Sequence, residues 1–385
     1  MSRHSVSVSR TGSGTGRTEN GKSKMTEKEL LREAKGDPVF AEDLLRIAHT
    51  ALPYEELKEK KILVTGATGL VGQAVVRALL TIARECRVPL TVCALCRDRE
   101  KTAALYDELL ERPALIPVYG DVRDAEIPDD TDIIIHAASP TASRFFVAKP
   151  VETMEIAIGG TKNMLEQARK TGAEMVYISS MEAFGVTDPE KDRIREEDLG
   201  YIDLTSVRSC YPESKRVCEL LCASYYHEYG VRAVSARLAQ TFGAGVDVSE
   251  GRVFAQFAKS AMAGEDIVLH TKGESWGNYC YTADAVTGIF TILLKGEPGT
   301  AYTVVNPSTS IRIRDMAELA AEKLSGGRSS VVFDIPEDSL RFGYAPDVKI
   351  KLSADRLMGL GWKPQVDLPE MYERLAASFR HQTGH

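Results

Sequence analysis

Two residues one helical turn apart, Tyr211 and Lys215, have types and a spacing that could do chemistry. They stand at i and i+4 in the segment YPESK, so on a helix they share one face. The charge of an ammonium group lowers the pKa of a phenol beside it, and the phenol can then act as a general base toward a hydroxyl group. Because this spacing is common by chance, its meaning depends on the elements around it.

A serine and a glutamate upstream form a second candidate pair. Ser180 and Glu182 follow the apolar run EMVYIS, which predicts a buried strand. At the carboxyl end of such a strand, where ligands bind, Ser180 could hydrogen-bond the reacting hydroxyl. Glu182 could exchange a proton at a neighbouring carbon or position a water molecule. A turn-capping serine and a solvated carboxylate are the structural alternatives, but the place after the strand favours function.

A glycine-rich segment, TGATGLVG, directly follows the short apolar run KILV and precedes a helical pattern. Gly66 would allow a tight turn, Gly69 would let the backbone approach a pyrophosphate, and Gly72 would allow close packing of the helix. The helix N-terminus would offer free N–H groups to the phosphates. The segment therefore predicts a dinucleotide site, with a purely structural turn as the alternative. The other predicted contacts in this loop are Thr68, Leu70 and Val71.

The choice between NAD and NADP depends on the end of the second predicted strand. No carboxylate stands at the strand tip to bind a ribose hydroxyl, and Arg97 could pair with a 2′-phosphate. This favours NADP slightly, although Arg97 could equally be a solvated surface residue. Asp121 and Val122, after the third strand, are placed to contact adenine, and Ala137 and Ala138 follow the fourth strand at the cofactor edge. The predicted cofactor contacts also include Tyr211 and Lys215, whose ammonium group can hydrogen-bond the nicotinamide ribose.

Short apolar runs that alternate with amphipathic helices predict how these residues are positioned. The pattern is typical of buried parallel strands with crossover helices, which indicates a Rossmann-type doubly wound α/β sheet with a smaller C-terminal α/β substrate lobe. We expect a disordered leader over 1–25 and a helical extension over 26–58. The Rossmann domain would cover 59–240, and 241–385 would form mainly the substrate lobe, interlocked with it.

Composition excludes several classes of partner. A net charge of −7 argues against nucleic acid, and no apolar run approaches the roughly 20 residues that a membrane span needs. Seven cysteines without a framework pattern indicate a reducing compartment, so we expect a cytoplasmic protein. Cys93 and Cys96 would point to opposite faces of a strand, and we predict no metal site.

The segments TGATGLVG, HAAS, SSMEAFG, YPESK and RLAQTFG, in this order, resemble the extended short-chain dehydrogenase/reductase family over roughly residues 58–380. That family includes NDP-sugar epimerases, dehydratases and decarboxylases. The resemblance implies a nucleotide-sugar substrate and a homodimer packed through the helix that starts near Tyr211. It places Tyr211, Lys215 and Ser180 in the catalytic positions.

Residues beside Ser180 distinguish the chemistries within this family. Met181 stands where the 4,6-dehydratases have an acid, and a thioether cannot protonate a leaving hydroxyl. Glu182 makes the segment similar to that of UDP-glucuronate decarboxylases. By resemblance, the substrate would also contact Ser139, Gln240, Arg252 and Arg341. The chain departs from the family pattern at Gln240 and Ala157, where Asn is usual, and at Gly277, where an arginine grips the pyrophosphate.

Our leading hypothesis is a UDP-glucuronate decarboxylase-like enzyme that acts through a 4-keto sugar. The enzyme alternatives are an NDP-sugar epimerase, dehydratase or reductase. A catalytically silent cofactor-binding protein is the alternative from another class, and the intact set of Tyr211, Lys215 and Ser180 argues against it.

Overall fold

The computed structural model describes residues 26–335 and 349–384. The predicted leader and Arg341 lie outside these residues. The core is a seven-stranded sheet in the order β11-β6-β5-β4-β1-β2-β3, and every pair is parallel. Its strands are β1 (Lys61–Thr65), β2 (Thr91–Cys96), β3 (Leu115–Tyr119), β4 (Ile133–His136), β5 (Glu174–Ser180), β6 (Ala233–Leu238) and β11 (Ala301–Val304). The predicted Rossmann-type fold is confirmed.

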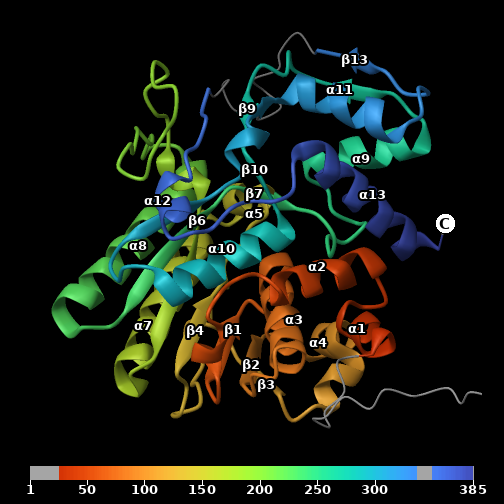
Figure 1. Ribbon diagram of the computed structural model, residues 1–385. Coiled ribbons are helices and arrows are strands. Elements are labelled where there is room, and N and C mark those ends of the chain that lie inside the picture. The colour runs from red at the N-terminus through yellow and green to blue at the C-terminus, as the bar shows by residue number, and fades with distance from the viewer. Residues whose placement is uncertain (1–25, 336–348, 385) are drawn as a thin grey trace, which may run out of the picture.

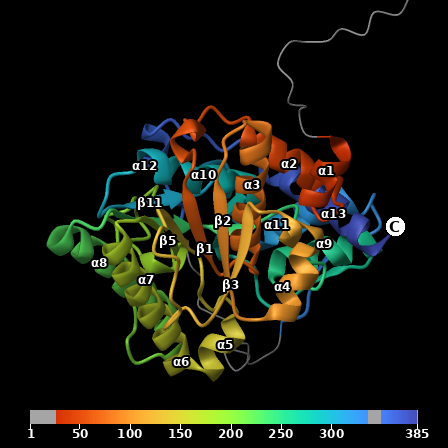
Figure 2. The ribbon, with the colours of Figure 1, turned by 90° about the horizontal axis from the view of Figure 1, so that it is seen from below.

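Helices cover both faces of this sheet, which explains why β1, β2 and β6 are buried along nearly their whole length (Figure 2). One face carries α3 (Leu70–Glu85) and α10 (Thr282–Lys295), and the other carries α7 (Gly160–Thr171) and α8 (Cys210–Tyr229). The connections contain α4 (Arg99–Tyr106), α5 (Ser143–Ala148) and α6 (Pro150–Met154), which runs through a π-turn into α7. Both α10 and β11 come from beyond residue 241, so the two halves of the chain interlock.

A smaller lobe begins where β6 ends, and it lies at the top right of Figure 1. Its strands form three short pairs, β7 (Gln240–Phe242) with β10 (Tyr279–Tyr281), β8 (Ile267–Leu269) with β13 (Val331–Phe333), and β9 (Trp276–Gly277) with β12 (Ile311–Arg312). Its helices are α9 (Val253–Ala263), α11 (Ile313–Leu324) and α13 (Leu368–Thr383), while α12 (Asp355–Gly359) contacts β11.

The N-terminal extension contains α1 (Glu27–Glu33), α2 (Pro38–Ala48) and a 3₁₀ turn over Tyr54–Leu57. Helix α2 packs against α3 and α10 of the sheet layer and against α13 of the smaller lobe (Figure 1). Its apolar side chains, Phe40, Leu44 and Ile47, are buried. The extension is therefore part of the packed molecule. Among the described helices, none is long and apolar enough to cross a membrane.

Candidate active site

The glycine loop is built so closely that two of its positions exclude any side chain. Gly66 has a φ of +63°, and a Cβ there would lie 2.8 Å from the backbone of Ala137 and Ala138. A Cβ on Gly72 would lie 2.2 Å from the carbonyl oxygen of Gly66. The first turn of α3 starts after Gly69 without a side-chain cap, which leaves its N–H groups for an anion. This cradle fits the pyrophosphate of a dinucleotide.

Buried polar side chains support the loop from below. The Thr65 hydroxyl accepts a hydrogen bond from the Ala138 N–H (3.0 Å), and the Tyr106 hydroxyl donates to the Ala67 carbonyl (2.5 Å). His136 is buried between the hydroxyls of Thr65 (2.7 Å) and Thr161 (3.2 Å). Burial lowers the pKa of His136 to about 3, so the imidazole is neutral and serves the structure.

Helix α8 brings Tyr211 and Lys215 to the end of β5. The Lys215 ammonium donates to the carbonyl of Ile178 (2.9 Å) and lies 5.5 Å from the centroid of the Tyr211 ring. Both side chains are almost fully buried. Burial lowers the pKa of Lys215 to about 8, so this group titrates close to neutral pH.

The phenol of Tyr211 has a raised pKa. Burial, together with the negative charge of Glu182, raises it to about 12. A hydrogen bond with Ser180 and the charges of Arg208 and Arg252 act in the opposite direction. The sequence-based expectation of a lowered pKa is therefore wrong for the protein alone, because desolvation outweighs the neighbouring positive charges.

Glu182 is held by an arginine that sequence reasoning did not assign to the site. The Arg208 guanidinium makes two contacts with the Glu182 carboxylate, at 2.9 and 3.0 Å, and both side chains are partly exposed. The Glu182 N–H donates to the Ser180 hydroxyl (3.2 Å), so Ser180 also caps the 3₁₀ turn after β5. Ser180 therefore caps the turn, as the structural alternative predicted, and also lies beside Tyr211.

Phe146, on α5, is a second residue that the sequence did not single out. Its ring stacks on Tyr211 with centroids 4.2 Å apart and an interplanar angle of 11°. The Arg208 guanidinium lies 5.0 Å from the centroid of the same ring. Phe146 therefore fixes the plane of the phenol and joins it to the ion pair of Glu182. No periodicity or motif marks such a contact, because it joins two segments that are distant in sequence.

The other predicted residues divide between the two ends of the site. Arg252 stands just before α9, pairs with Glu250 (2.8 Å), and its charge acts on the Tyr211 phenol. Ser139 is half-buried and donates to the Pro140 carbonyl (3.3 Å), while Gln240 is exposed in β7. No described contact joins either of these two to Tyr211.

At the cofactor end, Asp121 pairs with Arg123 of its own loop (2.9 Å), and this pairing lowers the pKa of Asp121. The Val122 carbonyl accepts from the Asn163 amide (3.0 Å). Arg97 is exposed after β2. The predicted contacts therefore follow the carboxyl edge of the sheet, where β2, β3 and β4 end.

At Gly277, the most serious departure from the family pattern, a neighbouring residue leaves no room for a side chain. A Cβ there would lie 2.2 Å from the hydroxyl of Tyr279, which is buried. A larger residue at 277 would have to displace that ring. The charge that the resemblance places here is absent, and the Lys351 ammonium lies 4.6 Å from the centroid of the adjacent Trp276 ring.

Comparison with known proteins places this site in a family. A profile of the NAD dependent epimerase/dehydratase family matches residues 62–306. The chain is 30% identical over 337 residues to UDP-glucuronic acid decarboxylase 1 of Xenopus tropicalis, which covers 86% of this chain and 74% of the relative. It is 28% identical to UDP-glucuronic acid decarboxylase 6 of Arabidopsis thaliana. The matched region covers 84% of this chain and 90% of that relative.

A similar solved structure is the UDP-glucuronic acid 4-epimerase of Bacillus cereus, crystallised with UDP-glucuronic acid and NAD. It is 19% identical, with a TM-score of 0.69, and covers 84% of this chain and 99% of its own. At this identity the likeness concerns the fold. The chain belongs to the NAD-dependent epimerase/dehydratase family, as the sequence motifs indicated.

The closeness of Gly72 to the loop makes a prediction. Gly72→Ala should weaken NAD binding at least roughly tenfold, because its Cβ would push the Gly66 carbonyl out of the cradle. Gly359→Ala is the matched control, since nothing lies within 4 Å of a Cβ there. Calorimetric titration with NAD checks both. Equal affinities in the two variants would show that the loop does not hold the cofactor.

Proposed function

We propose that this protein is an NAD(P)-dependent decarboxylase of a nucleotide-linked uronic acid, with UDP-glucuronate as the best candidate substrate. The observation that carries the proposal is the grouping of Ser180 and the Glu182–Arg208 pair around the buried phenol of Tyr211. The decarboxylases among its relatives support it, as does Met181, which lacks the acid that dehydration needs.

The glycine loop, with Gly66, Gly69 and Gly72, would hold the cofactor pyrophosphate, and Lys215 would meet the nicotinamide ribose. When bound, the cofactor supplies the acceptor for the C4 hydride of the sugar and later returns that hydride. Tyr211, after losing its own proton to solvent, takes as the phenolate the proton of the C4 hydroxyl while this carbon becomes a ketone. Ser180 orients the same oxygen by a hydrogen bond.

Loss of carbon dioxide follows from the position of the new ketone. The C5 carboxylate is then β to C4=O, so the electron pair of the breaking C5–CO₂ bond moves into an enolate at C4. The Tyr211 hydroxyl donates to this oxygen, and a proton is delivered to C5 with Glu182 placed to exchange it or to position a water. Reduction of C4 and return of the Tyr211 proton give a pentose nucleotide.

Arg208 has a separate role in this scheme. Because both terminal nitrogens of its guanidinium already contact the Glu182 carboxylate, the proposed scheme does not pair Arg208 with the substrate carboxylate. A carboxylate that binds without a cation loses its charge as carbon dioxide more easily, since no ion pair has to be broken. We therefore propose that Arg208 neutralises and orients Glu182.

A panel of nucleotide sugars tests the proposed reaction. UDP-glucuronate should lose carbon dioxide, seen by mass spectrometry, and Tyr211→Phe should lower kcat by about 10²–10⁴-fold because the base is gone. Glu182→Gln should lower kcat with a smaller change in KM. Isomerised or reduced products, or consumption of free cofactor, would favour an epimerase or a reductase. Undiminished turnover by Tyr211→Phe would overturn the mechanism.

The finer choice of cofactor rests on Arg97. Asp98 beside it accepts the Lys101 N–H as the N-cap of α4, so its carboxylate is already used. We propose that Arg97 lets the site accept the 2′-phosphate of NADP. Arg97→Ala should then weaken NADP binding by roughly tenfold and leave NAD binding unchanged, as competition binding can measure. If both cofactors bind the variant as they bind the wild type, Arg97 does not contact the 2′-phosphate and the proposal fails.

An apolar surface supports the proposed homodimer. Helices α6 and α8 contact each other and expose Val151, Met154, Val217 and Leu220. Exposed apolar side chains on two adjoining helices are typical of a subunit interface. Leu220→Glu should therefore give a monomer in light scattering, because a charge would be buried in the contact. A wild-type monomer, or a variant that stays dimeric, would contradict this interface.

A further inference from the structure

The loop between β7 and α9, residues 243–252, delivers Arg252 to the site. It leaves β7 at Gly243 and ends at Arg252, the N-cap of α9, whose charge acts on the phenol of Tyr211. Besides α9 itself, three helices among the described residues contact this loop. They are α2 of the N-terminal extension, α3 of the cofactor loop and α13 near the C-terminus.

The start of the loop rests on Tyr281. A Cβ on Gly243 would lie 2.3 Å from the Tyr281 ring, and the Ala244 N–H points to its hydroxyl at 3.5 Å. That hydroxyl donates to the Asp43 carboxylate of α2 (2.5 Å) and accepts from the Arg374 guanidinium of α13 (2.9 Å). The ring that supports the loop is therefore fixed by helices from both ends of the chain.

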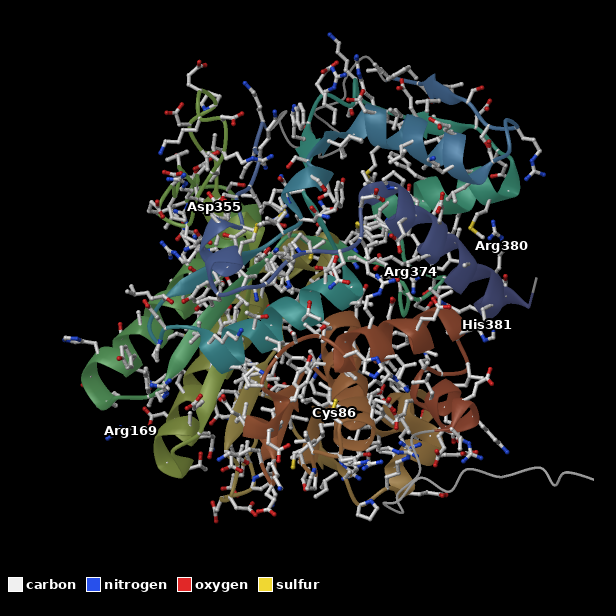
Figure 3. All side chains as sticks on the ribbon, viewed as in Figure 1. Cys86, Arg169, Asp355, Arg374, Arg380 and His381 are labelled. Atoms are coloured by element: carbon white, nitrogen blue, oxygen red, sulfur yellow. The ribbon has the colours of Figure 1, made fainter. Side chains whose placement is uncertain are left out.

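Arg374 joins these two helices directly. Its guanidinium donates to the Asp43 carboxylate (2.8 Å) and to the Val39 carbonyl (3.2 Å), and it lies between α13 and α2 (Figure 3). Both Asp43 and Tyr281 are buried. The cluster of Asp43, Tyr281 and Arg374 is therefore a desolvated polar network whose members restrict one another.

The middle of the loop is held by three further side chains. Gly245 has a φ of +85° and a Cβ there would meet the Phe40 ring of α2 at 3.5 Å, while its carbonyl accepts from the Gln73 amide of α3 (3.3 Å). On α13, the Gln382 amide donates to the Val246 carbonyl (2.7 Å) and accepts from the Val248 N–H (2.9 Å). Gln382 thus clamps the loop backbone from both sides.

We propose that α2 and α13 are working parts of the substrate site, because together they set the loop that presents Arg252. Both helices lie outside the residues 62–306 that the family profile matches. Asp43, Tyr281 and Gln382 are thus positioning residues for substrate binding. The kinetic part of this inference rests on the proposed function, since it takes UDP-glucuronate as the molecule that meets Arg252.

The test uses the full-length protein with Gln382→Ala and Tyr281→Phe, each alone and combined with Arg252→Ala. Glu373→Ala, an exposed change on α13, is the matched control. Gln382→Ala and Tyr281→Phe, each alone, should raise the KM for UDP-glucuronate by roughly threefold to tenfold and leave the Kd for NAD unchanged. If the residues act through Arg252, either change should add less than about twofold in the Arg252→Ala background, because the coupled effects are not additive. The proposal would be overturned if the KM increases of the single variants multiplied with that of Arg252→Ala. It would also be overturned if the affinity for NAD fell as much as the affinity for UDP-glucuronate.

Hydrogen exchange separates this proposal from the proposed function. In Gln382→Ala and Tyr281→Phe, amide exchange should accelerate in residues 243–252 and stay unchanged in the glycine loop, with no substrate needed. Unchanged exchange in residues 243–252 would overturn the proposal that α2 and α13 hold this loop, whatever the substrate is. Accelerated exchange in a protein that ignores UDP-glucuronate would leave the clamp standing and remove only the proposed reaction.

Discussion

A buried ammonium group fixes the geometry on which the site depends. Lys215 donates to the Ile178 carbonyl, and through this bond the first turns of α8 are held to the last residues of β5. An unpaired charge in such surroundings would cost several kcal/mol, so this contact strongly restricts how α8 can pack on the sheet. As a result, Tyr211 from the helix and Ser180 from the strand meet at one place.

The remaining parts of the site adjust the chemistry of that meeting point. Phe146 sets the plane of the phenol, and the Glu182–Arg208 pair supplies a carboxylate whose charge is compensated. Burial keeps Tyr211 protonated in the isolated protein. In the proposed reaction, the phenolate that accepts the C4 proton therefore forms only when cofactor and substrate are in place. This limits the reaction to the complete complex.

The sequence predicted the features that depend on local patterns. Continuous apolar runs identified the parallel strands, and the spacing of Gly66, Gly69 and Gly72 identified a turn that excludes side chains. It did not predict Phe146 or the Arg208–Glu182 pair, because these contacts join segments distant in sequence and no periodicity marks them. The pKa of Tyr211 was misjudged for the same reason, since desolvation depends on the whole packed surroundings. The role of α2 was also hidden, because a short amphipathic helix does not indicate which loop it will support.

In the proposed reaction, one site removes a hydride from C4, releases carbon dioxide from C5 and returns the same hydride. The most direct measurement is turnover of UDP-glucuronate carrying deuterium at C4, followed by nuclear magnetic resonance of the product, with a parallel reaction of unlabelled substrate in deuterated water. We predict a pentose nucleotide that keeps the C4 deuterium and takes one solvent deuterium at C5. Loss of the C4 label to solvent, or a product without solvent deuterium at C5, would contradict this reaction.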